Sequence, residues 1–325
     1  MQREKDGRDL ESEFRVGNMR GLARAITLVE RREPAVRHLL ESLSDRVHRP
    51  LVLGFTGAPG TGKSTLVDAI IAHLREQGKG VAVIAVDPNS PYSGGAILGD
   101  RVRMQRHALD SRVFIRSMGA RGHLGGLSVA TRESIRLIGA FGFDYVILET
   151  VGVGQSELEV AAIADCTLVV LTPGLGDGVQ MIKAGIMEIA DVFVVNKADL
   201  PGAQKTIQDI RAMLSEGPKG GRKPPIVPTV ASRGEGVKEL LAAVDSNLKH
   251  QEASGEAAQR AEGRLKDEAA DLVGEWSRAE ARRLLDDDPE LAAILLRDRI
   301  PYAAAEAILT RRRASLVPEA ARTER

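Results

Sequence analysis

The apolar residues of this chain form short runs that alternate with segments of helical periodicity. Runs of strand length lie at 51–55, 81–86, 113–116, 145–148, 166–171, 192–195 and 226–227. Mostly continuous apolar runs of this length are typical of strands buried on both faces in a parallel sheet. Between them, apolar residues recur at steps of three and four. Strands that alternate with helices predict an α/β domain with a doubly wound, mostly parallel sheet.

The two ends of the chain have different patterns. Residues 1–18 are mainly polar and predict a loosely ordered start, whereas 21–47 predict two short helices that are interrupted near Pro34. From 258 to 279 the apolar residues have heptad-like spacing, which predicts either an amphipathic helix packed on its own domain or an arm that pairs with a second subunit. We therefore expect an N-terminal helical extension (1–49), an α/β domain (50–250) and a C-terminal helical dimerisation arm (251–325).

Composition narrows the partners and the compartment. Lys plus Arg and Asp plus Glu both number 45, so no net charge favours a nucleic-acid or membrane partner. The single cysteine, Cys166, allows no disulfide within the chain, and no apolar run has the length of a membrane span. The N-terminal residues mix acids and bases, unlike a signal or transit peptide. Together these features predict a cytoplasmic protein.

A phosphate-binding motif follows the first apolar run directly. It consists of Gly57, Ala58, Pro59, Gly60, Thr61, Gly62, Lys63, Ser64 and Thr65. The glycines allow successive backbone N–H groups to point at phosphate oxygens, and the helix that begins at Lys63 adds its positive dipole end. Lys63 would contact the β- and γ-phosphates, and the Ser64 hydroxyl would bind Mg²⁺. A glycine-rich turn that precedes a helix by chance is the alternative, and the complete G-x-x-x-x-G-K-S spacing disfavours it.

A second motif indicates which base is bound. Asn196, Lys197 and Asp199 follow the sixth apolar run. A carboxylate at Asp199 can accept hydrogen bonds from guanine N1–H and N2–H₂, whereas adenine offers no donor at these positions. Because a buried polar group without a partner costs roughly 1–3 kcal/mol, this geometry favours GTP over ATP. A further loop of Ala231, Ser232 and Arg233 is a weaker candidate, because its backbone N–H groups could contact the guanine oxygen.

Three acidic residues are candidates for a magnesium site beside the phosphates. Asp87 and Glu149 each end an apolar run, and Asp100 lies between them in the sequence. Ser64 plus one or two carboxylates, direct or through water, would suit the oxygen coordination of Mg²⁺, although Asp100 could equally be a helix N-cap. Gly152, three residues after Glu149, is placed for a switch whose N–H binds the γ-phosphate. No glutamine follows Gly152, so slow hydrolysis is expected until a partner rearranges the loops.

These motifs together resemble one known family. The phosphate loop, Asp87–Pro91, His123–Gly126, Glu149–Glu157 and Asn196–Asp199 are similar to the MeaB/ArgK family of P-loop GTPases. The resemblance covers roughly residues 20–315. These proteins are the chaperones associated with methylmalonyl-CoA mutase, in the same class as nickel-insertion GTPases.

The resemblance implies further roles and partners. Lys63, Asp100 and Glu149 would serve catalysis, and Ser64, Asp87, Asp100 and Glu149 would serve the metal. Asp177, Gln180 and Lys183 would belong to a third switch that relays the nucleotide state. The chain would form a homodimer through its C-terminal arm.

The implied partner is an adenosylcobalamin-dependent acyl-CoA mutase, which itself holds the cobalamin. Methylmalonyl-CoA mutase is one candidate, and isobutyryl- or 2-hydroxyisobutyryl-CoA mutase are others; a cobalamin adenosyltransferase is a further candidate partner. GTP binding and hydrolysis would gate cofactor loading and protect or reactivate the mutase. Two alternatives stay open: a metal-insertion GTPase, although the six histidines are scattered, and a kinase for a small transport substrate.

Overall fold

A parallel sheet forms the centre of the fold in the computed structural model. The structure describes residues 10–33, 35–43, 48–87, 105–107, 109–119, 124–150, 156–174, 187–216, 223–298 and 301–316. The strands are β1 (Leu51–Thr56), β2 (Val81–Asp87), β3 (Val113–Gly119), β4 (Tyr145–Thr150), β5 (Cys166–Leu171), β6 (Val192–Asn196) and β7 (Ile226–Thr229). Their order is β3-β2-β4-β1-β5-β6-β7 and every pair is parallel. The carboxyl ends of all these strands therefore meet at one edge, where open α/β sheets bind ligands.

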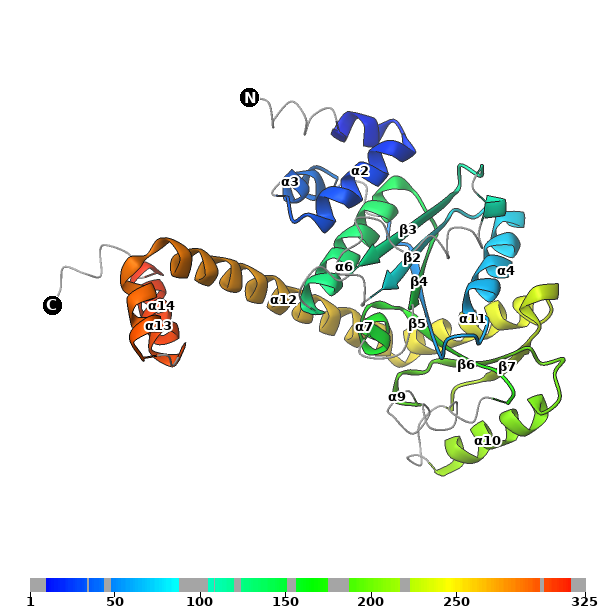
Figure 1. The fold of residues 1–325 in the computed structure, drawn as a ribbon. Helices are drawn as coiled ribbons and strands as arrows, with labels where there is room; N and C mark the ends of the chain where they lie inside the picture. Colours follow the sequence, from blue (N-terminus) through cyan, green and yellow to red (C-terminus); the bar gives the residue numbers. More distant parts are fainter. Residues whose placement is uncertain are drawn as a thin grey trace. The chain divides into compact units, whose positions relative to one another are not determined.

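Helices cover both faces of this sheet (Figure 1). The longer helices of the sheet domain are α2 (Met19–Glu30), α3 (Ala35–Ser42), α4 (Lys63–Glu76), α6 (Leu124–Phe141), α7 (Ser156–Ile163), α10 (Ala203–Glu216) and α11 (Val237–Ser254). The short ones are η2 (Gln105–His107), α9 (Met187–Ile189) and η4 (Ala231–Arg233). Thus the doubly wound α/β fold expected from the apolar runs is confirmed.

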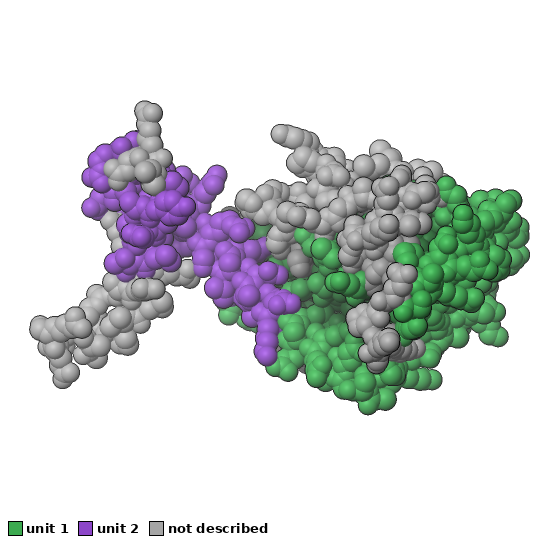
Figure 2. Space-filling view, turned by 90° about the horizontal axis from the view of Figure 1, so that it is seen from below, with its two compact units in different colours: residues 1–265 green, residues 266–325 purple. Residues whose placement is uncertain are grey.

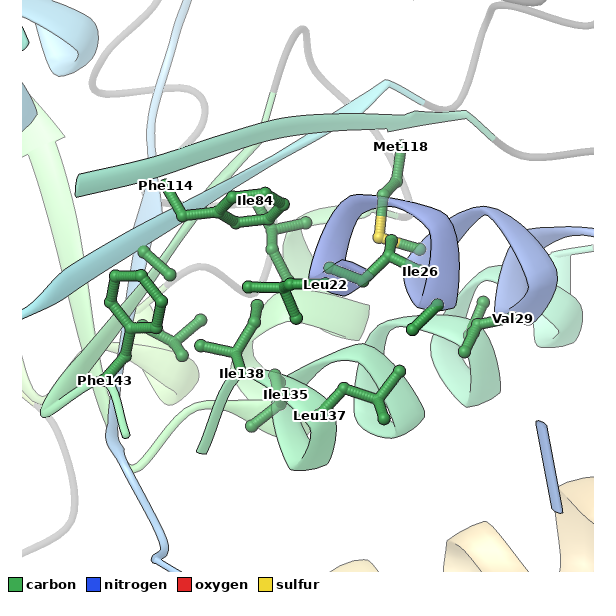
Figure 3. Close-up of a cluster of buried hydrophobic side chains, with 14 of the residues drawn as sticks. Leu22, Ile26, Val29, Ile84, Phe114, Met118, Ile135, Leu137, Ile138 and Phe143 are labelled. Carbon is green, nitrogen blue, oxygen red and sulfur yellow. The ribbon is translucent and has the colours of Figure 1, made fainter. Parts of the chain in front are cut away.

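Successive strand residues face opposite layers, because side chains alternate along a strand. Val52 of β1 packs in the cluster that α2, α3, α6 and α7 form, whereas Leu53 packs in the cluster of α4 and α11. Figure 3 shows the first cluster, in which Leu22 and Ile26 of α2 and Ile138 of α6 lie under the sheet. Burial on both faces is the physical reason why the strand segments have few polar residues.

The start of the chain differs from expectation. Residues 10–15 are helical, and Leu10 and Phe14 are buried in the same cluster as α2. The Phe14 ring meets Phe141 of α6 edge to face, with the ring centroids 5.3 Å apart. The prediction of a loosely ordered start was therefore wrong for this stretch, because two apolar residues four positions apart are enough to dock one helical turn.

The chain forms two compact units, residues 1–265 and 266–325 (Figure 2). Helix α12 (Glu256–Asp287) begins in the first unit and continues through the second, which also contains α13 (Pro289–Asp298) and α14 (Pro301–Leu316). The last two helices bury Leu291, Ala304 and Ile308. Val273 and Trp276 of α12 are exposed. Among the described helices, none combines the length and the apolar character that a membrane crossing requires.

Candidate functional site

The phosphate-binding motif forms the loop between β1 and α4, at the carboxyl edge of the sheet. At two of its positions the backbone is left-handed and crowded. Gly57 has φ +140°, and a Cβ there would lie 2.2 Å from the carbonyl oxygen of Val170. Gly62 has φ +88°, and a Cβ there would lie 2.4 Å from Asn196 Nδ2. Both positions therefore require glycine, since a side chain would strain the backbone and collide with a neighbouring strand end.

The motif lysine folds back over the loop. Lys63 is buried, and its Nζ donates to the carbonyl oxygens of Gly57 at 2.6 Å and Ala58 at 3.2 Å. The ammonium is thus desolvated, and its acceptors are neutral carbonyl oxygens. Hydrogen bonds to charged phosphate oxygens would be stronger. This arrangement can exchange the two carbonyls for phosphate.

A hydroxyl and a carboxylate from two elements meet beside this lysine. Ser64 Oγ on α4 donates to Glu149 Oε1 on β4 at 2.7 Å, and both side chains are buried. Parallel pairing puts Glu149 opposite Phe55 of β1, so the carboxylate lies next to the start of the loop. Both groups are oxygen donors, and hard oxygen donors are what Mg²⁺ requires. These two residues therefore fit a magnesium site.

The remaining predicted metal and switch residues are only partly visible. Asp87 ends β2, which pairs with β4 on one side, so its backbone lies one strand away from that of Glu149; its side chain lies outside the described part. Outside the described residues lie Asp100, Gly152, Asp177, Gln180 and Lys183. Within the described ranges, no group of three or more His, Cys, Asp or Glu side chains could hold a metal ion.

The Asn196 amide joins the phosphate loop to the predicted base-binding loops. Its Nδ2 donates to Thr61 O at 2.9 Å, and its Oδ1 accepts from Thr229 Oγ1 at 3.2 Å and from Ala231 N at 3.1 Å. All four residues that take part in these hydrogen bonds are buried. One side chain thus fixes the ends of β6 and β7 against the loop that follows β1.

Lys197 and Asp199 lie at the rim of the same edge. Lys197 has φ +56°, and its Nζ donates to Gly60 O at 2.8 Å, so its alkyl stem runs across the phosphate loop. Asp199 is exposed, and its Oδ2 lies 3.4 Å from Arg233 Nη1. Arg233 also pairs with Glu235, at 2.7 Å between Nε and Oε1. An exposed ion pair of this length is weak, so the Asp199 carboxylate can accept other donors.

The third loop uses two of its three backbone N–H groups within the protein. Ala231 N donates to Asn196, and Arg233 N donates to the carbonyl oxygen of Val230 at 2.9 Å. The expectation that this loop contacts the guanine oxygen therefore rests on the N–H of Ser232. The sequence alone does not distinguish these three N–H groups.

One buried acid at this edge had no assigned role. Glu157, the second residue of α7, is 6% exposed. Burial raises the pKa of its carboxyl, and the positive charge of Lys63 offsets part of that rise. No local pattern distinguishes this residue from an ordinary acid in the first turn of a helix, where such residues are common.

Comparison with known proteins identifies close relatives. The family model described as methylmalonyl-CoA mutase-associated GTPase MeaB matches residues 22–282. A Pyrococcus horikoshii protein whose name describes it as a GTPase is 44% identical over 306 residues, which cover 93% of this chain and 96% of that protein. The GTPase ArgK of Escherichia coli is 49% identical over 190 residues, which cover 57% of each chain.

Two further relatives extend this set. The mouse protein named methylmalonic aciduria type A homolog, mitochondrial, is 37% identical over 256 residues, or 73% of this chain and 62% of that protein. Among solved structures, the crystal structure of a protein named LAO/AO transport system kinase superposes with a TM-score of 0.68 at 28% identity. It covers 94% of this chain and 97% of that one.

Proposed function

Because this chain belongs to the MeaB family of GTPases, we propose that it is a GTP-gated chaperone of an adenosylcobalamin-dependent acyl-CoA mutase. The observation that carries this proposal is the match to the mutase-associated family model over residues 22–282. The partner is methylmalonyl-CoA mutase or a close relative that acts on isobutyryl- or 2-hydroxyisobutyryl-CoA. A cobalamin adenosyltransferase is a second candidate partner, because it would supply the cofactor that the mutase receives.

Nucleotide binding follows from the contacts at the carboxyl edge. The backbone N–H groups of 57–65 surround the phosphates, and Lys63 leaves the carbonyls of Gly57 and Ala58 for the β- and γ-phosphates. Asp199 accepts from the guanine edge, and the Lys197 stem covers one face of the base. Asn196 holds these two halves in register.

Hydrolysis requires positioning and charge neutralisation at the γ-phosphate more than covalent chemistry. Mg²⁺, when bound, would neutralise charge that develops on the phosphate oxygens. Ser64 and Glu149 would hold it from α4 and β4, and Asp87 and Asp100 are the proposed additional carboxylates. Glu149 and Asp100 also orient water, and Gly152 responds to the γ-phosphate.

The proposal also includes a switch that communicates the nucleotide state to the partner and a homodimer formed through the C-terminal arm. Asp177, Gln180 and Lys183 form the switch that communicates the nucleotide state. Leu265, Val273 and Trp276 of α12 are exposed at the heptad-like stretch, which supports pairing of this helix with a second copy. Sedimentation of the full chain tests the dimer, and a monomer at micromolar concentration would contradict it.

The decisive test is the GTPase rate with and without each candidate mutase. We expect at least one mutase to stimulate hydrolysis and to form a complex whose stability differs between the GTP- and GDP-bound forms. Lys63→Ala is the matched control, because it should abolish stimulation without touching the mutase. If no candidate mutase binds or stimulates the chain, the chaperone function is refuted.

A transport kinase is the second candidate, since the superposed crystal structure carries that name. Transfer of labelled γ-phosphate to any acceptor other than water would favour it. The third candidate, a metal-insertion GTPase, would require stoichiometric Ni²⁺ binding by the nucleotide-free protein.

A further inference from the structure

A buried carboxyl behind the phosphate loop has no part in the function proposed above. Glu157 Oε1 is inaccessible to solvent and has no hydrogen-bond partner among the described residues, and the same holds for Thr56 Oγ1. Each buried polar atom without a partner costs about 1–3 kcal/mol. Native proteins seldom keep such an atom without a functional reason.

The packing of α7 holds this carboxyl in place. A Cβ on Gly54 would lie 2.8 Å from Val160 Cγ1 and 2.9 Å from Ala164 Cβ, so α7 rests directly on the backbone of β1. Glu157 precedes Val160 by three residues and therefore lies on the same face of the helix. Because Val160 packs against Gly54, the turn of α7 that carries Glu157 lies beside the end of β1, whose last residue before the phosphate loop is Thr56.

Burial raises the pKa of the Glu157 carboxyl, and the charge of Lys63 offsets part of that rise, so the two groups lie within electrostatic range of each other. The Lys63 ammonium thus donates to the carbonyl oxygens of Gly57 and Ala58 and lies within range of a buried acid. Charges interact strongly in such a desolvated setting. An incoming phosphate must attract the same ammonium and approach the same acid.

We propose that Glu157 is a positioning residue that holds Lys63 in its inward position and opposes phosphate binding, so that nucleotide affinity is held below what the loop alone would give. The ligand class is the phosphate group of a nucleoside di- or triphosphate. This inference rests on the proposed nucleotide site at Lys63 and is independent of the mutase partner. A lower nucleotide affinity would let a switch protein release its nucleotide faster.

The test is GDP affinity, measured by calorimetry on the full chain with magnesium at mildly alkaline pH, where an ionised carboxyl matters most. Glu157→Gln keeps the size of the side chain and removes its charge. We expect GDP to bind about tenfold more tightly, which corresponds to ~1.4 kcal/mol. Glu159→Gln is the matched control, because it removes an acid from the same first turn of α7, and its affinity should equal that of the parent.

The sign of the change separates this role from a structural one. Damage to the fold would weaken GDP binding, whereas loss of an opposing charge strengthens it. A gain of at least about threefold supports the proposal, and a smaller gain, no change or a loss overturns it. Should Glu157→Gln fail to fold, Glu157→Met, a neutral side chain of similar length, decides by the same criterion. Stimulation of the parent by a mutase is a separate measurement, so the two proposals can fail independently.

Discussion

Gly62→Ala gives the sharpest test of how the phosphate loop is held. Gly62 has φ +88°, and a Cβ there would lie 2.4 Å from Asn196 Nδ2. That nitrogen donates to the carbonyl oxygen of Thr61. The added methyl group therefore strains the loop and also displaces the amide that binds it to β6 and β7.

The magnitude follows from two terms. A left-handed backbone costs a non-glycine residue about 1–2 kcal/mol. Displacing Asn196 leaves buried donors and acceptors without partners, at about 1–3 kcal/mol. We therefore expect Gly62→Ala to lower the free energy of unfolding by about 2–5 kcal/mol. Gly60→Ala is the matched control, because Gly60 has φ +81° with open space around its Cβ direction, so only the strain term applies.

Urea unfolding of the nucleotide-free, magnesium-free protein measures both variants. With equal denaturant slopes, the midpoints report the difference in stability directly. Gly62→Ala should be less stable than Gly60→Ala by about 1–3 kcal/mol, the contribution of the displaced amide. Equal losses in the two variants would refute the idea that contact with Asn196, beyond backbone strain, makes glycine necessary at this position.

Three further outcomes are expected. Ser64→Ala should lower the hydrolysis rate at least about tenfold and raise the magnesium concentration needed for half-maximal rate, because Glu149 loses its hydroxyl partner at 2.7 Å; a magnesium titration of phosphate release measures both. Asp199→Asn should weaken GDP binding on the order of 100-fold while improving binding of xanthosine diphosphate, whose C2 oxygen can accept from the new amide; calorimetry with both nucleotides checks the exchange. Asp191→Ala should lower the free energy of unfolding by about 2–3 kcal/mol, because the buried carboxylate accepts from Thr167 N at 2.8 Å and pairs with Arg260 at 3.1 Å. Urea unfolding measures this loss, and Asp209→Ala on the surface of α10 is the control, which should cost well under half as much.

The α/β fold could be predicted from the sequence, because a strand that is buried on both faces is a continuous apolar run. Strands such as 166–171 are covered by helices on each side, so they are apolar and easily found. The strand order could not be predicted, because it depends on crossovers that no single run encodes. The same limit explains the error at the N-terminus, where the burial of Phe14 depends on Phe141 far along the chain.

The candidate site divides in the same way. The phosphate loop is a local motif, and Ser64 and Glu149 lie within hydrogen-bond distance of each other at the edge of the sheet that also carries Lys63. The burial of Glu157 could not be predicted from the sequence, because it arises from the packing of α7 on β1. An acidic residue in the first turn of a helix is common and does not by itself indicate a buried group.

The hydrogen bonds of Asn196 couple the structure of the phosphate loop to that of the guanine motif. The residue lies 135 positions from Thr61, yet its amide is shared between the phosphate loop and the loop after β7. If the phosphate loop shifts, the amide must follow or leave buried groups without partners, and the ends of β6 and β7 move with it. Base and phosphate sites therefore cannot relax independently, since a single amide plane sets the distance between them. For this reason the guanine motif and the phosphate loop, although far apart in the sequence, can be held at the distance that separates the base from the phosphates of one nucleotide.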